Sequence, residues 1–376
     1  MKQVRKYSDN IFLASVILGV VVGAGVLYSR WQIVEAYWQT NFNTYSVNPD
    51  DIVYGGVARD TRIIPIDAPL FASARISSAE FNPFEPVIVV DYNNIERAYP
   101  LTILAMHEIV NDSLGDIPIA VTFCPLCNSA VVYRREVDGQ ILRMGVSGNF
   151  YGNNFLMYDH LTQSWWYQFT GEALVGDLTG KTLTIIPSQV VGFRIYADRY
   201  PDGEVLIGDA NNPNINYDLT PYNVYQNTRS PALTQSDYDP RLGTMERVLS
   251  TTINDVPIAY PFSVLQNVGV INHEMDGEAV VVFWQSGAIS ALENPSASSN
   301  DIGQAAAFGR ELNGQILTFR YDDGRIFDNE THSEWNIFGE AIAGELLGEA
   351  LYDYQCFTHF WFAWSSAHPD TLVYSQ

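Results

Sequence analysis

Two cysteines three residues apart, Cys124 and Cys127 in the segment Cys-Pro-Leu-Cys, are the side chains of this sequence best suited to chemistry. They lie in a predicted turn between two strands, residues 117–123 and 130–134. Thiols at this spacing suit a disulfide-exchange pair or half of a metal site. Covalent haem attachment is excluded, because residue 128 is Asn and not His. The alternative is a structural disulfide or two buried thiols, and a simple disulfide is the expected state outside the cytoplasm.

The third cysteine has a histidine at the same spacing, in the segment Cys356-Phe-Thr-His359. An internal repeat, described below, shows that each copy lacks the pair that the other copy contains. Cys356 and His359 align with Ser188 and Val191 of the first copy. Cys124 and Cys127 align with Gln285 and Ala288 of the second copy. If the copies pack about a pseudo-two-fold axis, the pairs could meet in a Cys3His site for zinc or copper(I). The alternative is a core cysteine and a satisfied core histidine, since cysteine is among the most buried residue types.

His107-Glu108 resembles the start of a metalloprotease helix, but the second histidine of that motif is replaced by Asn111, so this reading fails. His107 remains a candidate ligand or proton carrier near the cysteines, or a structural residue at a helix end. The sequence contains no nucleophile elbow, phosphate loop or dinucleotide fingerprint.

The elements that must position these residues occur twice. Residues 159–176 and 328–344 match in order and spacing at eight positions: Asp159/Asp328, Thr162/Thr331, Ser164/Ser333, Trp166/Trp335, Phe169/Phe338, Gly171/Gly339, Glu172/Glu340 and Gly176/Gly344. Further matches join residues 98–100 to 259–261 and 200–205 to 368–373. The period of roughly 160 to 170 residues is too long for a solenoid and indicates a duplicated domain. A catalytic group rarely needs duplication, so the Asp, Thr, Ser and Trp positions predict a structural turn with Asx and Ser/Thr hydrogen bonds.

Short strands with frequent turns predict a mostly β fold with minor α content, arranged as two similar lobes. A buried strand is expected at 86–91, followed by a hairpin turn at Asn93-Asn94, and a short helix is expected at 101–110. The predicted organisation begins with a cytoplasmic tip and transmembrane anchor (1–30) and a membrane-proximal segment (31–54). A first lobe (55–207), a connection (208–250) and a second lobe (251–376) follow.

The net charge of −23 arises from scarce basic residues, with lysine only at Lys2, Lys6 and Lys181. Nucleic acid is therefore excluded as an expected partner, because no basic stripe is present to neutralise phosphates. The hydrophobic content of 47% excludes a disordered chain.

Residues 11–28 form an uncharged apolar run that, at about 1.5 Å per residue, is just long enough to span a bilayer. Basic residues precede it, so the positive-inside rule places the N-terminus in the cytoplasm and the main domain outside, with Trp31, Tyr37 and Trp38 at the outer interface. We therefore expect a single-pass cell-membrane protein. A cleaved signal peptide and a buried core helix are the alternatives.

The segments 107–112, 122–134, 145–159 and 360–370 are similar to those of an uncharacterised family, catalogued as domain of unknown function 3179. The resemblance covers roughly residues 55–375. It implies a bacterial or archaeal envelope protein and brings no established activity.

Two hypotheses about function follow. The first is a membrane-anchored extracytoplasmic protein with a metal-binding role, for copper or zinc, or a thiol redox role, with Cys124, Cys127, Cys356 and His359 as candidate ligands. The second is a non-enzymatic accessory or structural subunit of a membrane or cell-surface complex, which its many aromatic residues would suit. Glycan binding is a third reading without a specific signal.

Overall fold

The computed structural model describes residues 37–217, 219–223, 225–228, 231, 238–293 and 300–375. The predicted transmembrane run at 11–28 lies outside these residues. Of the helices that are described, none is long and apolar enough to cross a membrane. The described chain is mostly β with a few short helices, which confirms that part of the predicted fold class.

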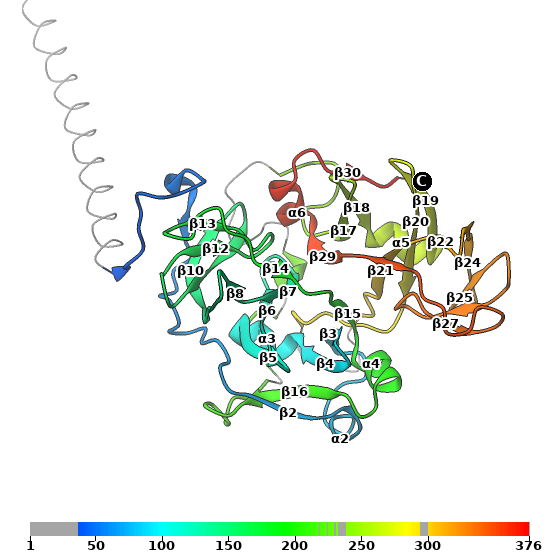
Figure 1. Cartoon of the computed structure of the whole chain (residues 1–376), viewed down its shortest axis with the longest axis horizontal. Coiled ribbons are helices and arrows are strands. Elements are labelled where there is room, and N and C mark those ends of the chain that lie inside the picture. The colour runs from blue at the N-terminus through cyan, green and yellow to red at the C-terminus, as the bar shows by residue number, and fades with distance from the viewer. Residues whose placement is uncertain are drawn as a thin grey trace, which may run out of the picture.

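The first lobe, residues 55–207, contributes to three main sheets and a small hairpin (Figure 1). The sheet at the lower end of Figure 1 has the order β15 (Gln189–Gly192), β3 (Pro86–Tyr92), β4 (Ile95–Pro100), β16 (Glu204–Asp209) and β2 (Pro69–Ser73). The next has the order β14 (Thr184–Ile185), β7 (Ser129–Arg134), β6 (Ile117–Cys124) and β5 (Ile109–Leu114). The third has the order β1 (Val53–Tyr54), β10 (Met144–Tyr151), β11 (Asn154–Asp159), β12 (Trp165–Tyr167) and β13 (Ala173–Val175).

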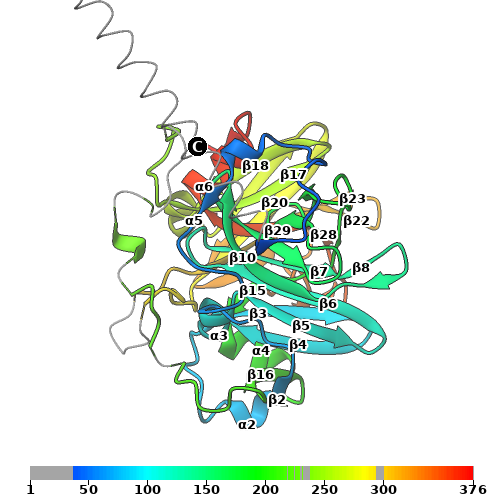
Figure 2. The same cartoon turned by 90° about the vertical axis from the view of Figure 1, so that its left-hand side faces the viewer.

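Short elements connect these strands. They are the 3₁₀ turn η1 (Pro49–Asp51), the hairpin β8 (Glu136–Val137) with β9 (Gln140–Ile141), and the helices α2 (Ala74–Ser77), α3 (Leu101–His107) and α4 (Phe193–Arg199). Figures 1 and 2 both place β2, β16 and α2 together at one end of the molecule. The predicted hairpin turn holds, since Asn93 and Asn94 adopt φ of 55° and 60° between β3 and β4, as a type I′ turn requires. The predicted helix ends at His107, three residues early, because β5 begins at Ile109.

The second lobe, described over residues 247–293 and 300–375, repeats these strand orders, except that its sheets contain no counterpart of β1 or β2 among the described residues. Its sheets are β29 (Cys356–Phe360), β17 (Arg247–Ile253), β18 (Val256–Pro261), β30 (Leu372–Val373); β19 (Val270–Met275), β20 (Glu278–Gln285), β21 (Gln304–Gly309), β28 (Tyr352–Tyr354); and β24 (Phe319–Asp322), β25 (Arg325–Asp328), β26 (Glu334–Trp335), β27 (Ala341–Ala343). The remaining elements are the 3₁₀ turn η2 (Tyr225–Asn227) in the connection, the hairpin β22 (Glu311–Leu312) with β23 (Gln315–Ile316), and the helices α5 (Phe262–Val268) and α6 (Trp361–Ala367). Each lobe contains one parallel strand pair at the same place, β4 with β16 and β18 with β30.

Individual side chains repeat the same contacts in both lobes. Asn111 donates to the Met144 carbonyl and accepts from the Met144 amide, each at 2.9 Å. Asn272 makes the same two bonds with Phe319, at 2.7 and 2.8 Å. These bonds join β5 to β10 in the first lobe and β19 to β24 in the second. In each lobe the asparagine side chain therefore fixes how two neighbouring sheets meet.

The matched aspartates form the predicted structural turn. Asp159 and Asp328 are fully buried, and their carboxylates accept hydrogen bonds from the Trp166 and Trp335 indole N–H groups, both at 3.0 Å. Each carboxylate also accepts from the backbone N–H of the Thr three residues on, at 2.6 and 2.5 Å. The residues at these positions are therefore scaffold, as the duplication argument predicted.

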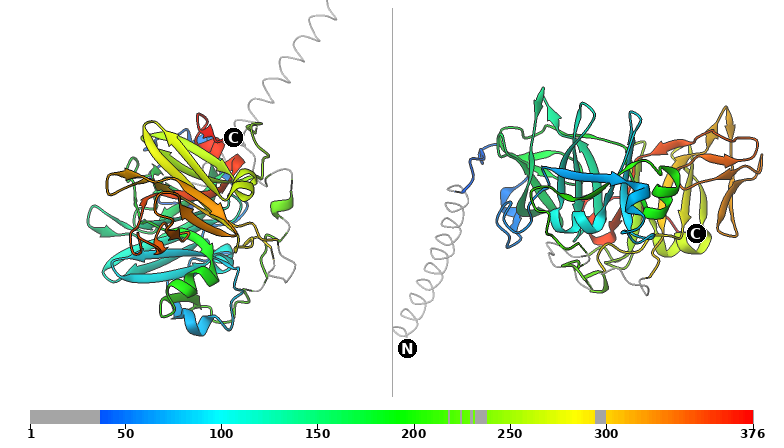
Figure 3. Two further views of the ribbon diagram at one scale, coloured as in Figure 1. Left: turned by 90° about the vertical axis from the view of Figure 1, so that its right-hand side faces the viewer. Right: turned by 90° about the horizontal axis from the view of Figure 1, so that it is seen from below.

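The two lobes lie side by side and share hydrophobic core (Figure 3). One buried cluster contains Val87 and Tyr196 of the first lobe together with Phe283 and Trp335 of the second. Another, centred on the first lobe, includes Phe360 of β29. Figure 1 shows β29 and α6 at the junction, close to β7. The elements that carry Cys356 and His359 therefore border the first lobe.

Candidate redox site

The Cys-Pro-Leu-Cys segment is the tip of the β6–β7 hairpin. Cys124 ends β6 opposite Ser129, which begins β7, and the Cys127 amide donates to the Cys124 carbonyl at 3.2 Å. Asn128 closes the loop with φ of 52°, a conformation that Asn tolerates better than most residues. This turn brings the two Cα atoms to 5.3 Å, and Cys124 and Cys127 form a disulfide. The sequence prediction of a cysteine turn between two strands is confirmed.

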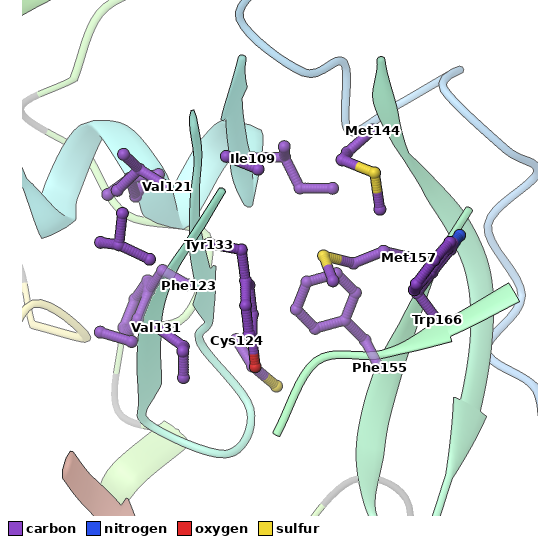
Figure 4. Close-up of a cluster of buried hydrophobic side chains, with 14 of the residues drawn as sticks. Ile109, Val121, Phe123, Cys124, Val131, Tyr133, Met144, Phe155, Met157 and Trp166 are labelled. Atoms are coloured by element: carbon purple, nitrogen blue, oxygen red, sulfur yellow. The ribbon is translucent and has the colours of Figure 1, made fainter. Parts of the chain in front are cut away.

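Both cysteines are enclosed, with 1% and 0% of their surface exposed. Side chains alternate along β6, so Cys124 and Phe123 point to opposite faces of the hairpin. Figure 4 shows Cys124 between two sheets, beside Tyr133 and Phe155, with Phe123 on the other face. A cavity between the lobes is lined by Phe123, Asn128 and Ala130 but by neither cysteine, so it does not open onto the sulfurs.

A buried polar group lies on the face of the hairpin that Cys124 occupies. Gln168 donates to the Thr122 hydroxyl at 3.0 Å and to the Ser129 carbonyl at 3.2 Å, and it accepts from Asn154 at 2.9 Å. The Ser129 hydroxyl and the Asn154 side-chain oxygen have no hydrogen-bond partner within the described chain. Buried polar atoms are nearly always paired. These two atoms can therefore form hydrogen bonds that the fold itself does not use.

Cys127 lies against the turn that joins β10 to β11. Its sulfur is 3.1 Å from the Asn153 carbonyl oxygen. A disulfide sulfur has no hydrogen to donate, whereas a reduced thiol has one. The Asn153 side chain in turn donates to the Ser366 hydroxyl of α6 at 2.8 Å. The same asparagine therefore contacts the disulfide of the first lobe and a helix of the second.

The backbone of the loop is held by the second lobe and by the connection. The Phe360 amide, at the end of β29, donates to the Cys127 carbonyl at 2.9 Å. The Tyr225 hydroxyl donates to the Leu126 carbonyl at 3.2 Å. Three parts of the chain that are distant in sequence therefore meet at the disulfide loop.

His359 borders this loop but is packed as a core residue. Its ring lies 4.6 Å from the Phe169 ring and is stacked on Trp364 at 5.5 Å. Burial, with a smaller effect from His368, lowers the pKa of His359 to about 3, so the imidazole is neutral. Its Nδ1 has no hydrogen-bond partner among the residues described.

Cys356 lies in a different environment from the other three predicted site residues. It is three positions before His359 on β29, and side chains three apart on a strand point to opposite faces. Cys356 is a half-buried free thiol that packs near Tyr260, and burial raises the pKa of this thiol to about 12. It is therefore protonated and directed away from the disulfide.

The structure consequently does not gather Cys124, Cys127, Cys356 and His359 into the predicted four-ligand centre. Throughout the described ranges, no group of three or more His, Cys, Asp or Glu side chains is placed to hold a metal ion. Two thiols are joined in a disulfide, and the other two candidates diverge because their spacing falls on a strand and not on a turn.

A family model described as "Protein of unknown function (DUF3179)" matches residues 61–371, which include both lobes and the connection. The chain belongs to this family. No curated protein and no solved structure matches the chain. The DUF3179 match therefore confirms the resemblance drawn from the sequence and leaves the activity to be argued from the site.

Two further residues of the DUF3179 region lie beside the hairpin. His107 ends α3, and its ring nitrogens are 2.6 Å from the Ile64 carbonyl and 3.0 Å from the Tyr217 hydroxyl. The metalloprotease reading fails in the structure too, because Asn111 lies on β5 and not on the helix. Glu108 is buried next to His107, and sequence reasoning passed over it. The internal alignment contained its signal, since the offset that matches 98–100 to 259–261 matches Glu108 to Gly269.

Proposed function

We propose that the protein is a membrane-anchored extracytoplasmic thiol redox protein whose reactive group is the Cys124–Cys127 disulfide. The observation that carries the proposal is the place of this disulfide. It joins the ends of a turn that β6 and β7 already hold together through six residue pairs. A disulfide adds little stability to a turn whose ends are already held together by the hydrogen bonds between two strands. Stabilisation of the fold is therefore a weak reason for this disulfide.

The size of the closed loop leads to the same conclusion. A disulfide that closes about four residues is worth roughly 2 kcal/mol by chain entropy, and less if the loop is already ordered. The second lobe joins the matching strands β20 and β21 through residues 286–303, a longer connection that would gain about 1 kcal/mol more from a cross-link. That connection contains no cysteine. The cysteines are therefore placed where cross-linking stabilises less than it would in the matching connection of the second lobe.

The surroundings suit a reduced pair as well as an oxidised one. Once reduced, the Cys127 thiol has the Asn153 carbonyl as an acceptor at 3.1 Å. This acceptor would stabilise the protonated Cys127 thiol once the disulfide opens. In the reaction, a partner dithiol gives two electrons and two protons, forms its own disulfide, and leaves Cys124 and Cys127 as thiols.

Access to the sulfurs requires the Pro125–Asn128 loop to leave its contacts. The hydrogen bonds from Tyr225 and Phe360 hold that loop, so the connection and the second lobe would control the reaction. The membrane anchor at 11–28 and the extracytoplasmic location rest on the sequence, and an oxidising compartment fits a stable disulfide. We also infer that the matching strand orders and side-chain contacts of the lobes arose by duplication.

The test is reversible thiol exchange in the folded, detergent-solubilised full chain. Glutathione buffers of increasing reducing power, followed by alkylation and mass spectrometry, should show one pair of cysteines converting between disulfide and dithiol. We expect Cys124→Ser and Cys127→Ser to abolish this exchange, and Cys356→Ser, the matched control, to leave it unchanged. A disulfide that resists excess reductant until the protein unfolds would refute the redox role and favour an accessory or structural subunit.

The same samples test the metal alternative. Reduced protein incubated with Zn²⁺ or Cu⁺ and then desalted should retain metal only if the freed thiolates bind it. Metal retained by wild type and lost in Cys124→Ser would assign copper or zinc to this pair. Retention that also requires Cys356 would restore the four-ligand centre.

A further inference from the structure

In the first lobe, the outer edge of β13 is covered by part of the membrane-proximal segment, residues 41–46. The Ser46 amide donates to the Leu174 carbonyl, and the Gly176 amide donates to the Thr44 carbonyl, both at 2.9 Å. The two segments are joined by an antiparallel bridge at this point. The covering segment therefore adds a short strand to the end of this sheet.

The covering segment also contacts the turn that follows β13. Asn41 donates to the Asp177 carboxylate at 2.8 Å, and the Thr179 hydroxyl donates to the Thr44 carbonyl at 3.2 Å. Leu174, at the centre of β13, is only 3% exposed. The covered edge thus combines backbone pairing, a contact with a carboxylate and a buried aliphatic side chain.

In the second lobe, the matching edge belongs to β27 and is open among the described residues. β27 ends its sheet as β13 does, and residues 348–350 cover only the start of this edge. No described segment forms a bridge with residues 342–344, which correspond to 174–176. Ile342, the counterpart of Leu174, is 49% exposed. Figure 1 shows β27 with β24 and β25 at the outer end of the second lobe, away from residues 37–50.

The second lobe nevertheless keeps the groups that hold the covering segment in the first. At the offset of the internal repeat, Asp177 corresponds to Glu345 and Thr179 to Leu347. Glu345 is exposed and forms no ion pair within the described chain, and Leu347 is 67% exposed. The open edge therefore presents the Gly344 amide, a carboxylate and two exposed aliphatic side chains.

Such an edge is a template for another strand. Proteins usually protect a sheet edge with lysine, proline or a bulge, because unpaired backbone groups recruit a further chain. Residues 342–344 are Ile, Ala and Gly and include neither lysine nor proline. Extended peptides bind edges of this kind through main-chain hydrogen bonds, while side-chain contacts give specificity.

We propose that the β27 edge at residues 342–344 binds an extended, basic segment of a partner protein. This segment adds to the sheet as the covering segment does in the first lobe. Its apolar side chains cover Ile342 and Leu347, and a lysine or arginine takes the place of Asn41 and reaches Glu345. The inference does not depend on the redox role proposed above.

Charge favours a basic partner over a second copy of this chain. The chain has a net charge of −23, and Glu345 and Glu349 beside the edge are both exposed. Two copies that met at this edge would bring these carboxylates together, and like charges across an interface oppose association. A basic segment meets the opposite charge at the same place.

The test uses a fluorescent synthetic peptide with the sequence of residues 39–48 and the change Asn41→Lys, added to the detergent-solubilised full chain. Fluorescence anisotropy should show saturable binding with a Kd on the order of 10⁻⁴ M, since a short peptide loses entropy as it becomes ordered. Ile342→Lys places a cation on the edge and should weaken binding by about tenfold or more. Ile316→Lys, the matched control at an isoleucine that is 55% exposed on β23, should bind as wild type does. Both variants should keep the wild-type melting temperature, because both positions are exposed.

Reversing the charges tests the contact with Glu345. The same peptide with Asn41→Glu should bind the wild-type chain about fivefold more weakly than the peptide with Asn41→Lys. In Glu345→Lys this preference should reverse. Glu274→Lys makes the same change of net charge at an exposed position on β19 and should keep the wild-type preference.

The remaining outcomes overturn the proposal. Absence of saturable binding up to about 1 mM peptide would refute it. Binding that Ile342→Lys leaves unchanged would also refute it, because the peptide would then occupy another place, such as the β13 edge of the first lobe. A wild-type dimer that Ile342→Lys abolishes in analytical ultracentrifugation would assign the edge to a second copy instead of a basic partner.

Discussion

Replacing Glu108 with glutamine should remove the contribution by which this carboxyl lowers the free energy of unfolding as the pH rises from about 4.5 to about 8. The folded protein holds the Glu108 proton up to a pKa of about 8, whereas the unfolded chain releases it near the ordinary value of 4.5. Between these values only the folded state carries the proton, so the free energy of unfolding falls as the pH rises. Below about pH 4.5 and above about pH 8, Glu108 does not change how the free energy of unfolding depends on pH.

The size of this effect makes it measurable. One pKa unit corresponds to about 1.4 kcal/mol, so a shift of this extent amounts to at most roughly 5 kcal/mol at pH 8. Denaturant titrations of the detergent-solubilised chain, followed by tryptophan fluorescence at several pH values, would give the slope. Glu80→Gln should run parallel to wild type. Parallel curves for wild type and Glu108→Gln would instead mean that the carboxyl is solvated and ionises normally.

Glu108 also shows what a sequence reading can overlook. The helix predicted at 101–110 ran through Glu108 and into β5, and a helical pattern does not report the unusual backbone angle of Glu108. The glycine at position 269 reported it, because glycine is the residue that a positive φ favours. A comparison of the two lobes asking where one has glycine and the other a titratable residue would have found this site.

The two cysteine-containing pairs show why equal spacing in the sequence led to unequal outcomes. Cys124 and Cys127 span a turn, which folds back and joins their sulfurs. Cys356 and His359 have the same separation on a strand, where the pleat sends them to opposite faces. β29 lies next to the first lobe, but the geometry of the strand directs the Cys356 and His359 side chains to opposite faces. Spacing predicts a joint site only once the element that carries it is known.

Hairpins and corners were predictable because local chemistry determines them. Asn93 and Asn94 have side chains that tolerate positive φ, and the Asp-x-x-Thr-x-Ser-x-Trp pattern supplies its own hydrogen-bond partners. The shared core was not predictable, since Val87 meets Phe283 only through the packing of one lobe on the other. The contact of Tyr225 with Leu126 has the same origin, because the connection contains no periodic pattern to place it.

Replacing Asp328 with alanine should lower the free energy of unfolding by about 3 kcal/mol, because several buried donors lose their acceptor together. These donors are the Trp335 indole at 3.0 Å, the Thr331 amide at 2.5 Å and the Ser333 amide at 3.0 Å. Although burial raises the pKa of Asp328, these hydrogen bonds outweigh it and hold the pKa below its usual value of 3.8. The stabilisation is therefore present above that value and is lost as the pH falls below it.

Asp159→Ala in the first lobe should have a similar effect, since it removes the acceptor of the Trp166 indole and the Thr162 amide. Asp328→Asn keeps one acceptor oxygen and should lose about half as much. The exposed turn residue Asp116 is the matched control, and its replacement by alanine should change stability by less than about 0.5 kcal/mol. Denaturant unfolding at pH 7 measures all four variants.

Because the lobes share a core, each aspartate variant should unfold the whole chain in one transition. Separate transitions for the two lobes, or a loss below 1 kcal/mol for both alanine variants, would show that the corners are not what holds this architecture together.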